Sequence, residues 1–219
     1  MKGSALQLFE EGLEDISQHL MVADHIRCST TAVISCAYGN LLRDTVTKTV
    51  GNIDAYFSKV LFELLVDRQA IYSANLSDKG DIRLSFSLKE VSELMVDVSE
   101  DPLRSNLALR RILDTKLRSL ALQNHTVPNS LSRLFGVKDF WSLAQKDPLT
   151  KSLVGDTDIH RKYRALTERR NAISHNRDRD IIGSTTQCAI SRDFVETGIL
   201  TTRIIVSTFE REVVSAYMN

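Results

Sequence analysis

Apolar residues recur every three or four positions along much of the chain, which is the spacing of an amphipathic α-helix. The pattern predicts one helix over residues 4–26. It predicts a second, long helix from Leu41 to about Tyr72, which Gly51 weakens by about 1 kcal/mol. Residues 28–40, between the two helices, show no clear period, and we expect a loop or a short buried segment there.

The middle of the chain, about residues 80–155, has a less regular pattern. Residues 81–88 (DIRLSFSL) alternate between apolar and polar, as a short strand would. However, Ser87 and Glu90 have the spacing of a capping box, which marks the start of a helix. The pattern around this segment therefore favours a helix that begins near Ser87.

Asp101 followed by Pro102 predicts the start of another helix, because proline is well tolerated in the first helical turn. This helix extends to about Gln123, and residues 125–130 (HTVPNS) break it. Residues 135–141 (FGVKDFW) concentrate aromatic side chains between two short helical pieces, which indicates a plug in the core.

The C-terminal third again has helical periodicity. Asp156 or Asp158 is expected to cap the first of its helices, and Ser191 or Asp193 the second. These helices are expected over residues 158–176 and 191–218. There is no internal repeat and no composition change at a domain boundary. We therefore predict an all-α bundle that forms a single domain over residues 1–219, with residues 80–155 as an inserted helical section.

The composition narrows the classes of function. The 28 basic and 28 acidic residues cancel, so any site for a polyanion must be a local patch. The three cysteines include no CxxC pair and leave one unpaired, which favours a reducing, cytoplasmic setting. The five histidines and three cysteines show no metal-ligand spacing, so we expect no metal site, and we expect no cofactor. No apolar run approaches the roughly 18 residues needed to span a membrane.

The most specific motif is Arg170-Asn171-x-x-x-His175, within the sequence TERRNAISHNRD. In a chain of this composition, roughly 0.02 matches to such a pattern are expected by chance. Arg170 falls on the apolar stripe of the predicted helix, whereas Asn171 and His175 lie on another side. In a straight helix, Arg170 and His175 diverge by about 140°. They can serve one site if the helix unwinds near Ser174, or if a second copy of the chain supplies one of them.

Basic residues are concentrated around this motif. Between Arg161 and Asp180 the chain carries seven cationic and three acidic side chains, a local excess in a neutral protein. Such an excess attracts phosphate groups, although a solvated helix face is the simpler interpretation without the Asn-His pair. The candidate phosphate-binding residues are Arg161, Arg164, Arg169, Arg177 and Arg179.

The segment RRNAISHNRD resembles the motif of HEPN domains, particularly the RiboL-PSP-HEPN-like group. The matching positions are Arg169, Arg170, Asn171, Ile173, His175 and Asp178. The long helix that begins near Leu41 and the FGVKDFW segment are also similar to that group. Arg177 stands where one subgroup of HEPN toxins has a tyrosine that a nucleotidyltransferase partner modifies, which argues against that subgroup.

The resemblance implies a HEPN-like bundle and a metal-independent RNA endonuclease of the toxin or host-defence type. Such enzymes are usually homodimers in which two motifs share one cleft, and an antitoxin or regulatory protein is a possible further partner. Arg170, Asn171 and His175 would then be the catalytic residues. The main alternative is a non-catalytic HEPN-like module that dimerises or binds a nucleotide or a partner protein, and a plain helical scaffold is a third possibility.

Overall fold

Helices make up all the regular structure in the part of the chain that the computed structural model describes. The described residues are 4–27, 32–67, 87–88, 92, 110–116, 122, 124–153, 158–175, 178 and 188–218. The all-α class is therefore as predicted from the periodicity.

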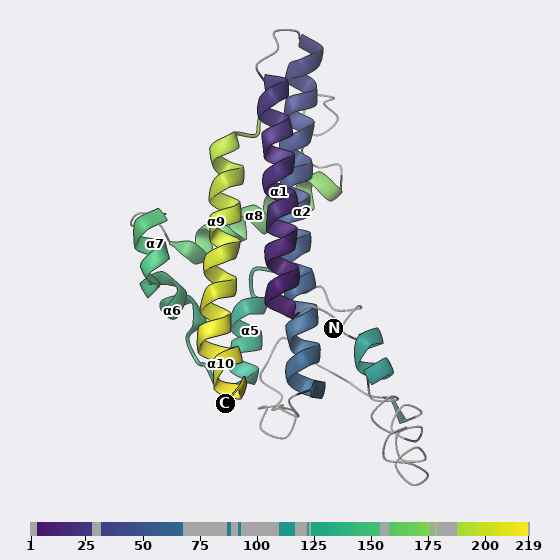
Figure 1. Cartoon of the computed structure of the whole chain (residues 1–219), viewed down its shortest axis with the longest axis vertical. Helices are drawn as coiled ribbons and strands as arrows, with labels where there is room; N and C mark the ends of the chain where they lie inside the picture. The colour runs from purple at the N-terminus through teal and green to yellow at the C-terminus, as the bar shows by residue number, and fades with distance from the viewer. Residues whose placement is uncertain are drawn as a thin grey trace.

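Helices α1 (Ala5–Arg27) and α2 (Ala32–Phe62) form a long hairpin along the longest axis of the molecule (Figure 1). The helix expected over residues 4–26 is thus confirmed. One face of α1 is buried against α2, and the side-chain amide of Asn52 donates a 2.9 Å hydrogen bond to the carbonyl of Phe9. A side chain at Gly12 would collide with Asn52, so glycine allows this close approach of the two helices.

The expectation of a loop over residues 28–40 is wrong from Ala32 onward, because α2 begins there. This stretch includes the small residues Cys36, Ala37 and Gly39, which give the hydrophobic pattern little contrast and hide the helical period. The long helix itself is confirmed. It runs to Phe62 and continues through a π-helical turn, η1 (Glu63–Asp67). The last residues of the predicted helix, 68–72, lie outside the described part.

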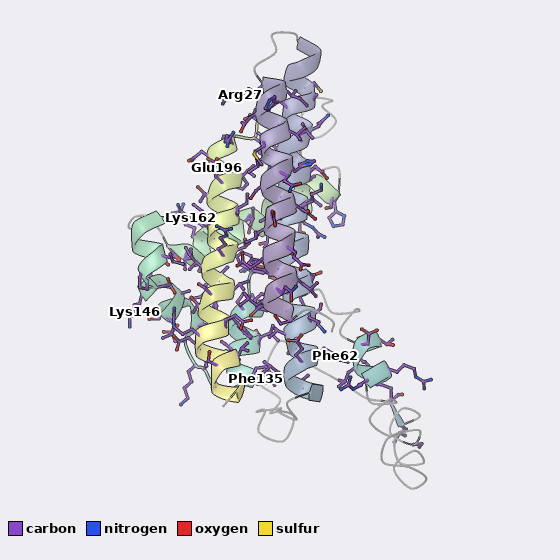
Figure 2. The ribbon with its side chains drawn as sticks, viewed as in Figure 1. Arg27, Phe62, Phe135, Lys146, Lys162 and Glu196 are labelled. Atoms are coloured by element: carbon purple, nitrogen blue, oxygen red, sulfur yellow. The ribbon has the colours of Figure 1, made fainter. Side chains whose placement is uncertain are left out.

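In the middle section, residues 110–116 are helical, within the helix expected from Asp101 to about Gln123. Three short helices lie further along the chain: α5 (Val127–Leu134), α6 (Phe140–Lys146) and α7 (Pro148–Leu153). The segment HTVPNS was expected only to break a helix, but its last residues begin α5. Pro128 lies in the first turn of α5, where its missing N–H removes no hydrogen bond. The aromatic plug between two short helices is confirmed, since Phe140 is buried and Phe135 caps the C-terminus of α5 at one end of the bundle (Figure 2).

The two predicted C-terminal helices are present with nearly the expected bounds. They are α8 (Ile159–Ser174) and α9 (Arg192–Phe209), and a π-helical turn η3 (Glu210–Val214) and a short α10 (Ser215–Met218) continue α9. Asp158 caps α8, accepting from the backbone N–H groups of His160 and Arg161. Ser191 caps α9 by accepting from the N–H of Phe194.

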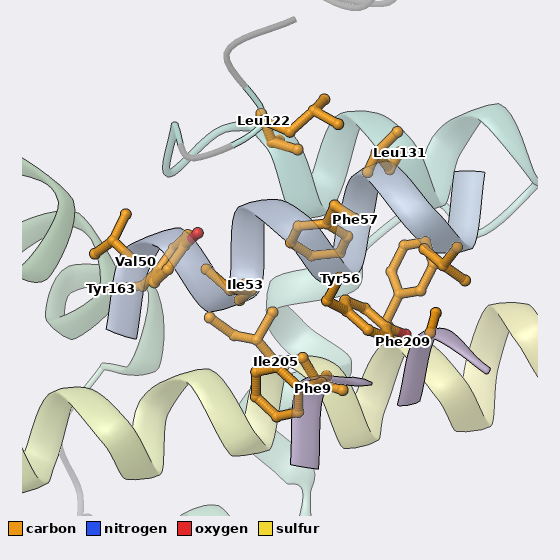
Figure 3. Close-up of a cluster of buried hydrophobic side chains, with 14 of the residues drawn as sticks. Phe9, Val50, Ile53, Tyr56, Phe57, Leu122, Leu131, Tyr163, Ile205 and Phe209 are labelled. Carbon is orange, nitrogen blue, oxygen red and sulfur yellow. The ribbon is translucent and has the colours of Figure 1, made fainter. Parts of the chain in front are cut away.

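Helix α8 crosses behind α9 and α2 (Figure 1) and packs against both. Gly198 of α9 makes the crossing close, because a Cβ there would lie 2.6 Å from a methyl carbon of Leu166. The core that these helices enclose contains Phe9 of α1, Phe57 of α2 and Phe209 of α9 (Figure 3). The Phe57 and Phe209 rings lie 5.3 Å apart, centroid to centroid. The position of α8 is thus fixed by packing on two long helices.

Two predictions fall on residues outside the described part. These are the possible strand at 81–86 and the cap at Asp101 and Pro102. Ser87 is non-helical and Leu88 is helical, as the capping-box interpretation expects.

Within the expected insertion, α5, α6 and α7 pack on α9, and the rings of Phe140 and Phe209 lie 6.2 Å apart. Among the described helices, none is long and apolar enough to cross a membrane.

Candidate functional site

Helix α8 carries two distinct stripes of side chains. Its buried stripe runs through Ile159, Tyr163 and Leu166 to the half-buried Arg170 and Ile173. A second stripe lies exposed to solvent and contains Arg164, Glu168, Asn171 and, just past the helix end, His175. The spacings of four, three and four residues place these four on one face. The separation between Arg170 and the Asn171–His175 pair is therefore as the sequence predicts.

Asn171 contacts both other residues of the motif. Its side-chain oxygen Oδ1 accepts a 3.2 Å hydrogen bond from Nη1 of Arg170. Its backbone carbonyl accepts a 3.1 Å hydrogen bond from the N–H of His175. Although Arg170 and His175 lie on different faces, Asn171 thus joins the guanidinium of one to the backbone of the other.

His175 is the C-cap residue of α8, with φ −100° and ψ 17°, and its side chain is exposed. Because its N–H still donates to the carbonyl four residues earlier, the helix does not unwind before His175. Among the interactions of the described residues, none links the Arg170 guanidinium directly to the His175 ring. Unwinding of the helix near Ser174, one of the two expected routes to a shared site, is therefore not observed.

The candidate phosphate-binding residues differ in their surroundings. Arg161 is exposed. Arg164 is also exposed and forms a 2.7 Å ion pair with Glu168, with 59% of each side chain accessible to solvent. Such an exposed pair contributes little stability, so a phosphate group could displace the carboxylate. Arg169 forms an ion pair with Asp178. Arg177 and Arg179 lie outside the described residues.

Asp178 is the centre of a buried ionic network. Its carboxylate lies 2.7 Å from Nε of Arg43 and 2.9 Å from Nη2 of Arg169. The carbonyl of Cys188 also accepts from both arginines, at 2.6 and 2.9 Å. Arg43 and Asp178 are 8% and 6% exposed, so this carboxylate is shielded from solvent and its pairing matters for stability.

The network fixes the chain just after the motif. Arg43 belongs to α2, Arg169 to the last turns of α8, and Cys188 to the segment that leads into α9. Asp178, three residues beyond His175, is therefore anchored to two helices. In the sequence, only the family resemblance points to Asp178, and nothing points to Arg43. The two residues are 135 positions apart, so their pairing leaves no local signal in the sequence.

A second polar group, the half-buried Asp54 of α2, lies on a helix that packs against α8. Burial raises the pKa of the Asp54 carboxyl, while the positive charge of Arg170 and a hydrogen bond from the backbone N–H of Leu122 act in the opposite direction. Burial also raises the pKa of the Tyr163 hydroxyl strongly, and the charge of Asp54 adds to this effect. Asp54 thus interacts with two residues on the buried stripe of α8, one of which is Arg170.

Three aromatic rings, those of His125, His160 and Trp141, lie together near the start of α8 and are called the aromatic ladder. The His160 ring stacks on Trp141 with centroids 4.5 Å apart, and the His125 ring lies 5.6 Å from His160 on the neighbouring turn. Burial lowers the pKa of His160, and the nearby His125 lowers it further. The neutral imidazole is therefore favoured, which suits a packing contact between α6 and α8. At about 1.5 Å per residue, the 15 positions to His175 separate this ladder from the motif by about 22 Å.

The described residues contain no group of three or more histidine, cysteine, aspartate or glutamate side chains placed to hold a metal ion. Cys36 and Cys188 are free thiols, and Cys28 lies outside the described part. Comparison of the chain with protein-family models, curated proteins and solved structures finds no match. The candidate site is therefore characterised by its own residues: a half-buried arginine, an amide that contacts it, and an exposed histidine at a helix end.

Proposed function

We propose that the protein is a metal-independent RNA endonuclease of the HEPN type, with a site built from Arg170, Asn171 and His175. The observation that carries the proposal is the position of Asn171, which accepts from the Arg170 guanidinium and, through its carbonyl, from the His175 N–H. This arrangement holds a permanent cation and a titratable imidazole at the same helix end, beside the exposed Arg164. The sequence resemblance to the HEPN motif points to the same chemistry.

RNA brings its own nucleophile to this reaction, the 2′-OH next to the scissile phosphate. His175 takes the proton of the 2′-OH while the oxygen attacks phosphorus, and the resulting imidazolium gives the proton to the departing 5′-oxygen. The bond from phosphorus to the 5′-oxygen breaks, and the products are a 2′,3′-cyclic phosphate and a 5′-hydroxyl. Arg170 stabilises the extra negative charge on the phosphate oxygens in the transition state. The proton transfers and the charge stabilisation in this reaction need no metal ion or cofactor.

The proposed active form is a homodimer. Within one chain, Arg170 lies on the buried stripe of α8 while His175 is exposed at the helix end. A two-fold axis near the end of α8 would bring Arg170 of one copy towards His175 of the other. The face with Arg161 and Arg164 would then line the cleft in which the RNA backbone binds.

The first prediction is that the purified protein cleaves RNA in EDTA. The cleavage rate should change by no more than about twofold when magnesium is added, because protons and charge are handled by side chains alone. The measurement is cleavage of a defined single-stranded oligonucleotide, with mass spectrometry of the products to detect the 2′,3′-cyclic phosphate.

Two outcomes would contradict this prediction. If activity is absent in EDTA and returns with magnesium, the proposed mechanism is wrong. If folded protein binds RNA or a nucleotide without cleaving it under either condition, the non-catalytic HEPN-like module replaces the endonuclease. The occupied Arg169 favours that alternative, because it reduces the number of free cations near the motif.

A second prediction tests whether the site is shared between two copies. Arg170→Ala and His175→Ala proteins should each be inactive, but refolding them together as a mixture should restore activity. About a quarter of the parent activity is expected, because half of the dimers are mixed and each has one complete site. The measurement combines cleavage assays with light scattering. Full activity of a strictly monomeric parent protein would exclude the shared site.

The family resemblance extends the proposal to biological role. HEPN endonucleases of this kind act as toxins or in host defence, so we propose the same role in the cytoplasm. An antitoxin or another regulatory protein would then hold the activity in check. Expression of the parent and of His175→Ala in the same host tests this role, since only the parent should arrest growth.

A further inference from the structure

Among the described residues of α2 and α8, five side-chain polar atoms are buried without a hydrogen-bond partner. Two of them are Nε2 of His160 and Nε of Arg169. The other three are Oδ1 of Asp54, the hydroxyl of Tyr163 and Nε of Arg170. Tyr163 is fully buried and packs beside Val50 of α2 (Figure 3). Arg170 follows Tyr163 by seven residues, which places both on the stripe of α8 that faces the bundle.

The unpaired atoms of Asp54 and Arg170 are chemically complementary. A carboxylate oxygen only accepts hydrogen bonds, and the Nε–H of an arginine only donates. Buried polar groups are nearly always paired in folded proteins, so an unpaired donor and acceptor near each other call for an explanation. Asp54 lies on α2 and Arg170 on α8, two helices that pack against each other, and the positive charge of Arg170 lowers the pKa of Asp54 against the larger effect of burial.

The Arg170 guanidinium has a limited set of partners in the free protein. Its Nη1 donates to Asn171, while its Nε has no acceptor. A phosphate is bound best by two parallel N–H groups of one guanidinium, and this requires the plane of the group to be fixed. An acceptor for the Nε–H would fix the plane of the guanidinium. Both Nη groups could then donate to the phosphate.

We infer that Asp54 is a positioning residue for Arg170: its carboxylate accepts the Nε–H of Arg170 when an RNA phosphate binds, and so directs both Nη groups at the phosphate. This inference rests on the proposed ribonuclease function. The backbone N–H of Leu122 holds the carboxylate in place, so the arginine side chain makes the movement. Binding of the phosphate also releases Nη1 from Asn171, and the Asn171 amide is then able to contact the substrate.

If Asp54 had a purely structural role, its replacement would lower the stability of the fold. The raised pKa of Asp54 predicts the opposite effect at neutral pH. The folded-state pKa of Asp54 lies above its ordinary value of 3.8. Its contribution to stability is therefore fully present below that ordinary value and is lost as pH rises through the raised folded-state pKa. At neutral pH the ionised carboxylate, which faces Arg170 and Tyr163, costs stability. A neutral replacement should thus leave the fold at least as stable.

The test compares Asp54→Asn and Asp54→Leu with Asp44→Asn. Asp44 is a matched control because it lies on the same helix, is exposed and pairs with Lys48 and His19. Cleavage of a single-stranded oligonucleotide should fall about tenfold in kcat for Asp54→Asn and about a hundredfold for Asp54→Leu, with KM little changed. The melting temperature of Asp54→Asn at pH 7 should equal or exceed that of the parent. Asp44→Asn should keep kcat within about twofold.

Two results would overturn the inference: parent-like kcat in both Asp54 variants, or a loss of kcat that appears only together with a lower melting temperature. An inactive parent protein would instead reject the proposed function. In that case the pair is still tested by melting temperatures of Asp54→Asn, Arg170→Gln and the double variant. Non-additive shifts support a charge interaction between the two side chains in the free protein, whereas additive shifts exclude it.

Discussion

Replacement of His175 by alanine is expected to abolish RNA cleavage while the protein keeps its fold. Loss of general acid–base help from an imidazole typically lowers a rate roughly 10²- to 10⁴-fold. The side chain of His175 is exposed, and its one hydrogen bond within α8 comes from the backbone N–H, which alanine retains. Single-turnover cleavage rates, measured on protein whose melting temperature matches that of the parent, would check this expectation.

Two further variants sharpen the comparison. Arg170→Ala should also lose cleavage, and it should weaken RNA binding as well, because the guanidinium is the proposed phosphate ligand. His125→Ala changes a histidine whose ring lies 5.6 Å from that of His160, near the start of α8 and away from the end that carries His175, and should keep cleavage within a few-fold. If His175→Ala cuts RNA at the parent rate, the motif has no catalytic role and the non-catalytic module becomes the better description.

Replacement of Asp178 by alanine is expected to produce the largest loss of stability from a single polar side chain in the described part of the protein. The change leaves Arg43 and Arg169 without their shared carboxylate in a site where Arg43 is only 8% exposed. Removal of one partner from a buried ion pair typically costs about 3–5 kcal/mol. Urea unfolding should show a lower midpoint, and the melting temperature should fall by roughly 10 °C.

Glu168→Ala is the matched control for this variant. Glu168 also pairs with an arginine of α8, but both side chains are 59% exposed, and exposed pairs contribute about 0–1 kcal/mol. The two variants therefore remove the same kind of interaction at different depths. Equal unfolding midpoints for Asp178→Ala and Glu168→Ala would show that the network around Asp178 does not anchor the fold. A large difference would establish it as the anchor of the chain beyond His175.

The helices near the motif were predictable because their signals are local. Asp158 and Ser191 cap their helices through backbone N–H groups two or three residues away, and such short-range bonds do not depend on the rest of the fold. The start of α2 was missed for the converse reason. Its small residues carry no periodic contrast, and the helix forms there as one side of the hairpin with α1.

The sequence alone determined the composition of the candidate site and the faces on which its residues lie. Helical spacing places Arg170 on the buried stripe and Asn171 with His175 on the exposed one, because side chains three and four residues apart share a face. Only the tertiary structure decided which partners surround them. Arg43 meets Asp178 at a separation of 135 positions, and the charge of Arg170 acts on Asp54 from another helix, since both effects arise where α2 packs against distant parts of the chain. Pairings of this kind depend on how the helices cross, and the spacing of residues within one helix carries no information about them.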